Sequence, residues 1–284
     1  MEKEATQSAS SPLLVFEVEC PICYSGKIKY YSLKAKTLPS RPNVFEVPVY
    51  EESPKFTHVD FNELTHTVCY HCFYTSSKKS DFNYLDPHTQ IRSYSETNKK
   101  IIDHWQNNSK EIEHVLLDCF INADSFIHPR TSEGVIASYK LAIYKATLEI
   151  LYKIPFNNYK RAKQYLKLYY LHNMYYKNFN VEYLIKAAED LEEVFRTSDF
   201  PEKSFEFEVC YLLVAIYIRL SEDGKAGSFI KTLDQSKGEM VAKAKDNPDI
   251  NLQDINKWLS KAKNLWQSRT DAEVWKLEKP LTLF

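Results

Sequence analysis

Two Cys-x-x-Cys motifs constrain this chain more than any other feature of its sequence. They are Cys20-Pro21-Ile22-Cys23 and Cys69-Tyr70-His71-Cys72, and 45 residues lie between Cys23 and Cys69. Two such turns present four thiolates that can close a tetrahedron around one ion, and zinc prefers closed four-sulfur sites of this kind. We therefore predict that one structural zinc ion is bound per chain, with four ligands: Cys20, Cys23, Cys69 and Cys72.

Other uses of these cysteines fit the residues less well. A redox Cys-x-x-Cys needs a strand-to-helix context, but each motif follows a strand-like run and no helical pattern comes after it. Two disulfides would need an oxidising compartment. An iron or iron–sulfur site also suits four thiolates, and the spacing does not exclude it. His66 and His71 lie beside the second motif; because four cysteines already complete the shell, we expect both histidines to be exposed or to support the ligands.

The pattern of the chain changes near residue 90. Residues 1–90 hold seven of the 12 prolines, and three short β-favouring runs at residues 14–18, 27–31 and 44–47 predict strands. After residue 95 the apolar residues recur with a helical period of about 3.6. Seven segments carry an apolar stripe with this period and are predicted to be helical: residues 101–119, 136–150, 162–176, 184–195, 205–220, 226–240 and 252–266.

These patterns predict an α+β chain, a small zinc-ribbon-like β module followed by an all-α, tetratricopeptide-like antiparallel helical array. Leu213, Tyr217 and Ala226 have the large-large-small spacing of a tetratricopeptide repeat. An ordinary antiparallel bundle is the alternative for the same helices. The predicted parts are a disordered N-terminus at 1–13, the metal-binding module at 14–90, the helical domain at 95–270 and a C-terminal tail at 271–284.

The two cysteine motifs and the helical run resemble a known family, the bacterial domain-of-unknown-function family 2225. The matching segments are Cys20-Pro21-Ile22-Cys23, Ser32-Leu33-Lys34, Val68-Cys69-Tyr70-His71-Cys72-Phe73-Tyr74, Asp81-Phe82, and the run from Tyr211-Leu212-Leu213 to Arg219-Leu220, so the likeness covers roughly residues 14–245. It implies that the four cysteines are metal ligands, and it implies no activity. The family has Gly after each knuckle, whereas this chain has Tyr24 and Phe73, and Tyr70 replaces the Pro of the second knuckle.

Composition and charge indicate whether this chain is suited to bind nucleic acid or a membrane. The net charge is −1, and residues 1–90 carry nine Lys and Arg against eleven Asp and Glu. That balance disfavours nucleic acid, which is bound mainly through basic contacts to phosphates. No apolar run approaches the ~20 residues that span a bilayer, and no secretory signal is visible, so we expect a cytoplasmic protein without membrane contact.

Aromatic side chains crowd the predicted helix at 162–176. Tyrosines are enriched in protein interfaces, and helical spacing distributes these over more than one face. We therefore expect a protein or peptide to bind the helical domain, with four candidate contacts: Tyr169, Tyr170, Tyr175 and Tyr176. Packing of the rings inside the domain is the alternative.

The function predicted from these features is that of a non-enzymatic scaffold or adaptor, in which a structural zinc ribbon is fused to a protein-interaction domain. The sequence has no phosphate-binding loop, dinucleotide fingerprint, nucleophile elbow or His-Glu-x-x-His motif. The first alternative is a nucleic-acid- or ribosome-associated zinc-ribbon protein. A metalloenzyme ranks third, because four thiolates leave no coordination position for a substrate or water.

Overall fold

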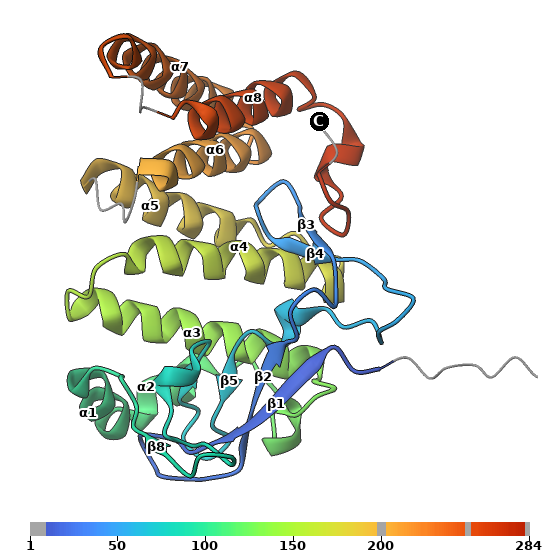
Figure 1. The fold of residues 1–284 in the computed structure, drawn as a ribbon, viewed down its shortest axis with the longest axis vertical. Helices are drawn as coiled ribbons and strands as arrows, with labels where there is room; N and C mark the ends of the chain where they lie inside the picture. The colour runs from blue at the N-terminus through green and yellow to red at the C-terminus, as the bar shows by residue number, and fades with distance from the viewer. Residues whose placement is uncertain (1–9, 198–202, 248–250, 282–284) are drawn as a thin grey trace, which may run out of the picture. The chain divides into compact units, whose positions relative to one another are not determined.

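The computed structural model describes residues 10–197, 203–247 and 251–281. Its contacts divide the described chain into two compact units. Unit 1 consists of residues 10–41 and 48–145, and unit 2 consists of residues 42–47 and 146–281. Figure 1 shows both units, with the α-helices and most of the strands labelled.

Unit 1 contains short antiparallel strand pairs. Its sheets each have two strands among the described residues, and the pairs are β1 (Leu13–Val18) with β2 (Ile28–Leu33), β3 (Ser40–Pro42) with β4 (Pro48–Tyr50), β5 (Thr67–Val68) with β6 (Thr75–Ser76), and β7 (Tyr84–Leu85) with β8 (Arg92–Ser93). In the longest pair Val15 lies opposite Tyr31. Isolated two-stranded sheets are at best marginally stable in water. Unit 1 therefore depends on what its strands pack against.

The helices of unit 1 are short apart from the last. They are the 3-10 turns η1 (Phe61–Leu64), η2 (Lys79–Asp81) and η3 (Ala123–Phe126), the helices α1 (Lys99–Asn107) and α2 (Ser109–Val115), and the first part of α3 (Ser132–Leu151). The single helix expected at 101–119 is instead α1 followed by α2. The side-chain amides of Asn107 and Asn108 donate to the carbonyls of Asp103 and His104, at 2.7 and 2.8 Å. These bonds satisfy carbonyls that a continuing helix would use, so α1 ends there.

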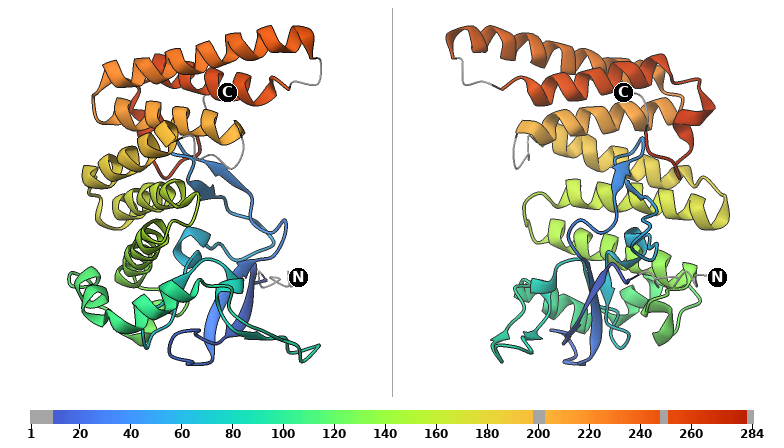
Figure 2. Two further views of the ribbon diagram at one scale, coloured as in Figure 1. Left: turned by 90° about the vertical axis from the view of Figure 1, so that its left-hand side faces the viewer. Right: turned by 45° about the vertical axis from the view of Figure 1, so that its right-hand side comes forward.

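Unit 2 is an array of helices in which sequence neighbours pack on one another. It contains the end of α3, then α4 (Asn157–Tyr176), α5 (Val181–Thr197), α6 (Lys203–Arg219), α7 (Asp223–Asp246), α8 (Gln253–Gln267) and the 3-10 turn η4 (Ala272–Trp275). Helix α6 packs against α5, α7 and α8, and Figure 2 shows these helices from two further directions. Every residue from Val209 to Ala215 is buried, which explains why this helix carries the longest apolar run of the sequence.

The α+β fold class with a small β part and a helical array is thus confirmed. Whether the helix pairs are true tetratricopeptide-like repeats stays a prediction. None of the described helices is both long enough and apolar enough to cross a membrane. The division into a module at 14–90 and a helical domain at 95–270 also stays a prediction. Most of the N-terminal segment predicted to be disordered, residues 1–9, lies outside the described residues.

The strand expected at residues 44–47 is wrong. These residues form the turn between β3 and β4, and they belong to unit 2. The turn is closed by Asn43, whose side-chain oxygen accepts the backbone N–H groups of Phe45 and Val47 at 2.9 and 3.2 Å. Its apolar side chains are buried. The run is apolar because the turn lies in the core of unit 2, not because it alternates in a sheet.

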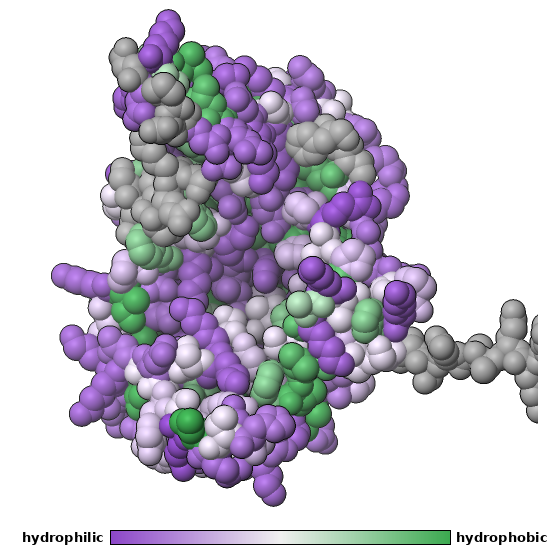
Figure 3. Space-filling model, in the orientation of Figure 1, coloured by the Kyte–Doolittle hydropathy of each residue, from purple (hydrophilic) through white to green (hydrophobic). Residues whose placement is uncertain are grey.

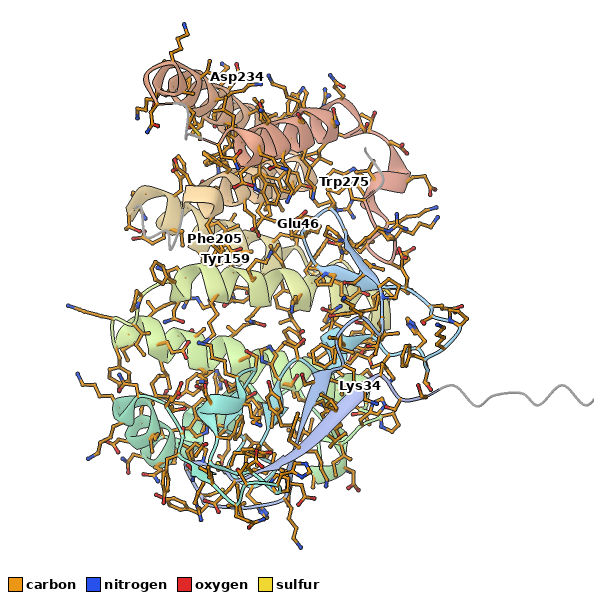
Figure 4. The ribbon with its side chains drawn as sticks, viewed as in Figure 1. Lys34, Glu46, Tyr159, Phe205, Asp234 and Trp275 are labelled. Atoms are coloured by element: carbon orange, nitrogen blue, oxygen red, sulfur yellow. The ribbon has the colours of Figure 1, made fainter. Side chains whose placement is uncertain are left out.

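The buried turn is held by aromatic and polar groups of unit 2. The Phe45 ring packs edge-on against Tyr169, with centroids 5.6 Å apart, and lies 6.3 Å from the ring of Trp275. The Tyr211 hydroxyl donates to the Val44 carbonyl at 3.0 Å. Glu46 forms an ion pair with Lys261 of α8, and Figure 4 labels Glu46 and Trp275. A buried ammonium is tolerated in a core when it has such a partner.

Candidate metal centre

The two Cys-x-x-Cys motifs form loops of the same shape. The first follows β1 and the second follows β5. In the first loop, the Tyr24 N–H donates to the Cys20 carbonyl at 3.1 Å, and the Cys20 N–H donates to the Ser25 carbonyl at 2.9 Å. In the second loop, the Phe73 N–H donates to the Cys69 carbonyl at 2.7 Å, and the Cys69 N–H donates to the Tyr74 carbonyl at 2.8 Å. Each loop therefore turns its two thiols to the same side.

The residue after each motif has a left-handed backbone. Tyr24 and Phe73 both have φ of 58°, a conformation that normally favours glycine. The resemblance noted from the sequence implies glycine at both positions, but both loops close with the larger residues in place. A non-glycine residue in this region costs on the order of 1–3 kcal/mol, which the surrounding contacts must offset.

The four cysteine sulfurs come together. All four Sγ atoms lie within 4.8 Å of one another, and Cys20–Cys72 and Cys23–Cys69 are each 3.5 Å apart. A tetrahedral ion with metal–sulfur bonds near 2.3 Å separates its ligand sulfurs by about 3.8 Å. The cluster is therefore positioned to hold one metal ion, and its all-sulfur donor set suits zinc or iron.

Burial and hydrogen bonding differ among the four thiols. Cys20 and Cys69 are buried, Cys72 is half-buried and Cys23 is exposed. Hydrogen bonds from the thiols of Cys20 and Cys72 lower the pKa of Cys69 to about 2, whereas the bond to Cys69 raises the pKa of Cys20. A bound metal would displace the thiol protons, because thiolates are the ligands.

Helix α1 supports both loops from one side. The Trp105 indole N–H donates to the Cys72 carbonyl at 2.9 Å, and the Gln106 amide donates to the Ile22 carbonyl at 2.9 Å. Two adjacent residues of one helix therefore fix one carbonyl in each loop. Such outer contacts orient metal ligands. Trp105 lies in the apolar stripe at residues 101–119, and no sequence pattern distinguishes Gln106.

Tyr74 extends this support behind the second loop. Its ring is fully buried and packs against Phe82 and Trp105, each with centroids 5.5 Å away. Its hydroxyl hydrogen-bonds the Thr97 hydroxyl at 2.6 Å. The Lys145 ammonium lies 5.3 Å from the ring centroid and pairs with Asp81. These contacts therefore join the second cysteine loop to α1 and to the part of α3 that belongs to unit 1.

The other sequence candidates lie outside the four-sulfur cluster. His66 is buried with its ring 4.7 Å from that of Tyr139, and His71 is exposed. Neither belongs to the group of atoms that could hold the metal. Cys119 is half-buried and Cys210 is buried in α6, so both are separate thiols.

The four candidate tyrosines of α4 have different environments. Tyr169 and Tyr170 are buried, Tyr175 is half-buried and Tyr176 is 44% exposed. The Tyr169 hydroxyl accepts a hydrogen bond from Arg219 at 3.2 Å. Partner binding by these residues stays a prediction, and Tyr176 is the exposed one of the four.

Comparison with known families matches residues 14–266 to a family described as uncharacterized protein conserved in bacteria (DUF2225). The chain belongs to this family. The match covers both cysteine loops and the helices from α1 to α8 almost to its end, so the resemblance inferred from the motifs is confirmed. No curated protein and no solved structure was found to match.

Proposed function

We propose that this DUF2225 protein is a non-enzymatic zinc-binding adaptor, in which zinc stabilises unit 1 and unit 2 binds a protein partner. The observation that carries the proposal is the closed set of four sulfurs within 4.8 Å of one another. A four-thiolate site leaves no open position for a substrate or a reactive water, as a catalytic zinc site would require. Its role would therefore be to hold the two loops together.

The burial of the cluster and its support by α1 favour a structural zinc ion over an ion that exchanges freely with solvent. Three of the four cysteines are at least half-buried, and both loops are tied to α1 through Trp105 and Gln106. Because the unfolded chain has no preformed site, the free energy of metal binding adds to the stability of the folded module. The two-stranded sheets of unit 1 need such a contribution.

The proposed partner surface lies at the connection between α4 and α5. Four apolar side chains are exposed within ten residues there: Tyr176 (44%), Phe179 (42%), Val181 (49%) and Ile185 (43%). Val181 and Ile185 are four residues apart on α5, so they lie on the same face of that helix. Figure 3 shows one face of the molecule, on which most residues are hydrophilic and the apolar residues form small patches. Exposed apolar clusters bordered by polar residues are typical of protein-binding sites.

A pull-down from the native cell tests the proposal with two matched variants. Ile185→Asp should abolish capture of the specific partner, because it places a charge in the apolar surface. Val241→Asp on α7, where the side chain is 38% exposed, should leave capture unchanged. Capture that is lost after RNase or DNase treatment, and unaffected by Ile185→Asp, would favour the nucleic-acid-associated alternative.

A further inference from the structure

A pocket of about 340 Å³ opens beside the metal centre, inside unit 1. Its polar lining consists of Cys23 and Cys72 from the cysteine loops and of Gln106, Ser109 and Glu113 from α1 and α2. His71 also lines the pocket, and its apolar lining consists of Ile22, Phe73, Trp105 and Ile112. The volume is within the range of ligand pockets, and the mixture of apolar walls with a few polar groups is typical of them.

The pocket is negatively charged once the metal is bound. Four thiolates around one Zn²⁺ carry a net formal charge of about −2. The exposed Glu113 carboxylate adds to it from α2. No lysine or arginine of the described chain lines the pocket. An anion is therefore repelled, and a cation that enters the pocket meets no lysine or arginine side chain in its lining.

We propose that this pocket binds an arginine side chain of a protein partner. This inference rests on the proposed function, because the zinc–thiolate charge provides most of the attraction. A guanidinium group can donate to a thiolate sulfur and to a carboxylate at the same time, since its five N–H groups spread in a fixed plane. Its three-carbon stem would lie against Phe73 and Ile112, as long basic side chains commonly lie on apolar surfaces.

Three blocked tripeptides test the pocket on the zinc-loaded full-length chain: acetyl-Gly-Arg-Gly-amide, its norleucine counterpart and its glutamate counterpart. Nuclear magnetic resonance can follow the Trp105 indole N–H and the Gln106 amide, which both lie at the pocket. The arginine peptide should shift these two signals in a saturable way. The norleucine peptide should bind far more weakly, and the glutamate peptide should give no shift.

A charge variant with a matched control completes the test. Glu113→Gln should weaken the arginine peptide by roughly threefold, the range of an exposed ion pair. Glu239→Gln, on an exposed position of α7 in unit 2, should leave its affinity unchanged.

The possible outcomes separate the two proposals. Zinc in the purified protein together with equal binding of the arginine and norleucine peptides, or binding that is indifferent to Glu113→Gln, overturns the arginine pocket alone. Purified protein that contains no metal contradicts the proposed function and removes the charge on which the pocket depends.

Discussion

The two units of this protein are stabilised in different ways. Unit 1 is built from two-stranded sheets and short helices around a four-cysteine cluster, and α1 fixes both cysteine loops. Unit 2 is built around α6, whose residues from Val209 to Ala215 are all buried. Unit 1 should therefore depend on a metal and unit 2 on apolar packing. Each prediction below tests one side of this difference.

Removing the metal should have the largest effect, and only on unit 1. Metal binding in small four-ligand modules supplies an apparent ~10–16 kcal/mol. With a chelator, hydrogen exchange should become fast in β1, β2 and the two cysteine loops, while the amides of α6 stay protected. Cys20→Ser should give the same pattern without a chelator, and Cys119→Ser, outside the cluster, should resemble the unchanged protein. Equal loss of protection in α6 would show that the two units do not differ in this way.

Phe45→Ala should destabilise unit 2, although residue 45 lies between the two cysteine motifs in the sequence. The ring is fully buried against Tyr169 and Trp275, and truncating such a residue lowers the free energy of unfolding by about 3–5 kcal/mol. Chemical denaturation followed by the helical circular dichroism signal measures this. Val241→Ala, a partly exposed position of α7, is the control and should change stability little. If Phe45→Ala leaves the helical transition unchanged, the turn does not belong to the core of unit 2.

Tyrosines of α4 should separate into structural and surface groups. Tyr169→Ala should cost about 3–5 kcal/mol of unfolding free energy, because the ring is buried. Tyr176→Ala should cost within about 0.5 kcal/mol, the usual range for surface positions, and should weaken partner capture. Paired melting and pull-down measurements distinguish the two. Loss of stability at both positions, with capture intact, would assign the whole tyrosine group to packing.

The sequence predicted which four cysteines come together, but not the residues that hold their two loops in place. Two Cys-x-x-Cys motifs are recognisable from spacing alone, since each motif needs only a local turn. Trp105 and Gln106 were not singled out, because they donate to carbonyls that lie 33 and 84 residues away in the chain. No local pattern marks a helix residue that will meet a distant loop.

The helices were predicted more reliably than the strands for a related reason. Stripes with a period of 3.6 report burial on one face of a helix, and six of the seven stripes each match one helix. The run at residues 44–47 had the composition of a strand but is a buried turn. Composition reports burial, and only an alternating pattern over several residues separates a strand from a turn that enters a core.

The smallest predicted effect concerns the left-handed residues of the two loops. Tyr24→Gly should raise the stability of the metal-bound protein by up to ~1 kcal/mol, because glycine adopts this backbone without strain and the Tyr24 ring is mostly exposed. Phe73→Gly should give no such gain, since its ring packs against Phe126 with centroids 6.3 Å apart. Thermal melting of the zinc-loaded variants checks both. A large loss at Tyr24 would mean that its ring has a role beyond closing the loop.

The number of metal ions per chain tests the central claim most directly. Native mass spectrometry of freshly purified full-length protein should show one zinc ion per chain. Single serine variants of the four cysteines in the cluster should lose it, and Cys119→Ser should keep it. Iron in the same stoichiometry would change the metal but retain the four-sulfur site. Protein with no bound zinc or iron, and with four freely titrating thiols at Cys20, Cys23, Cys69 and Cys72, would contradict the account.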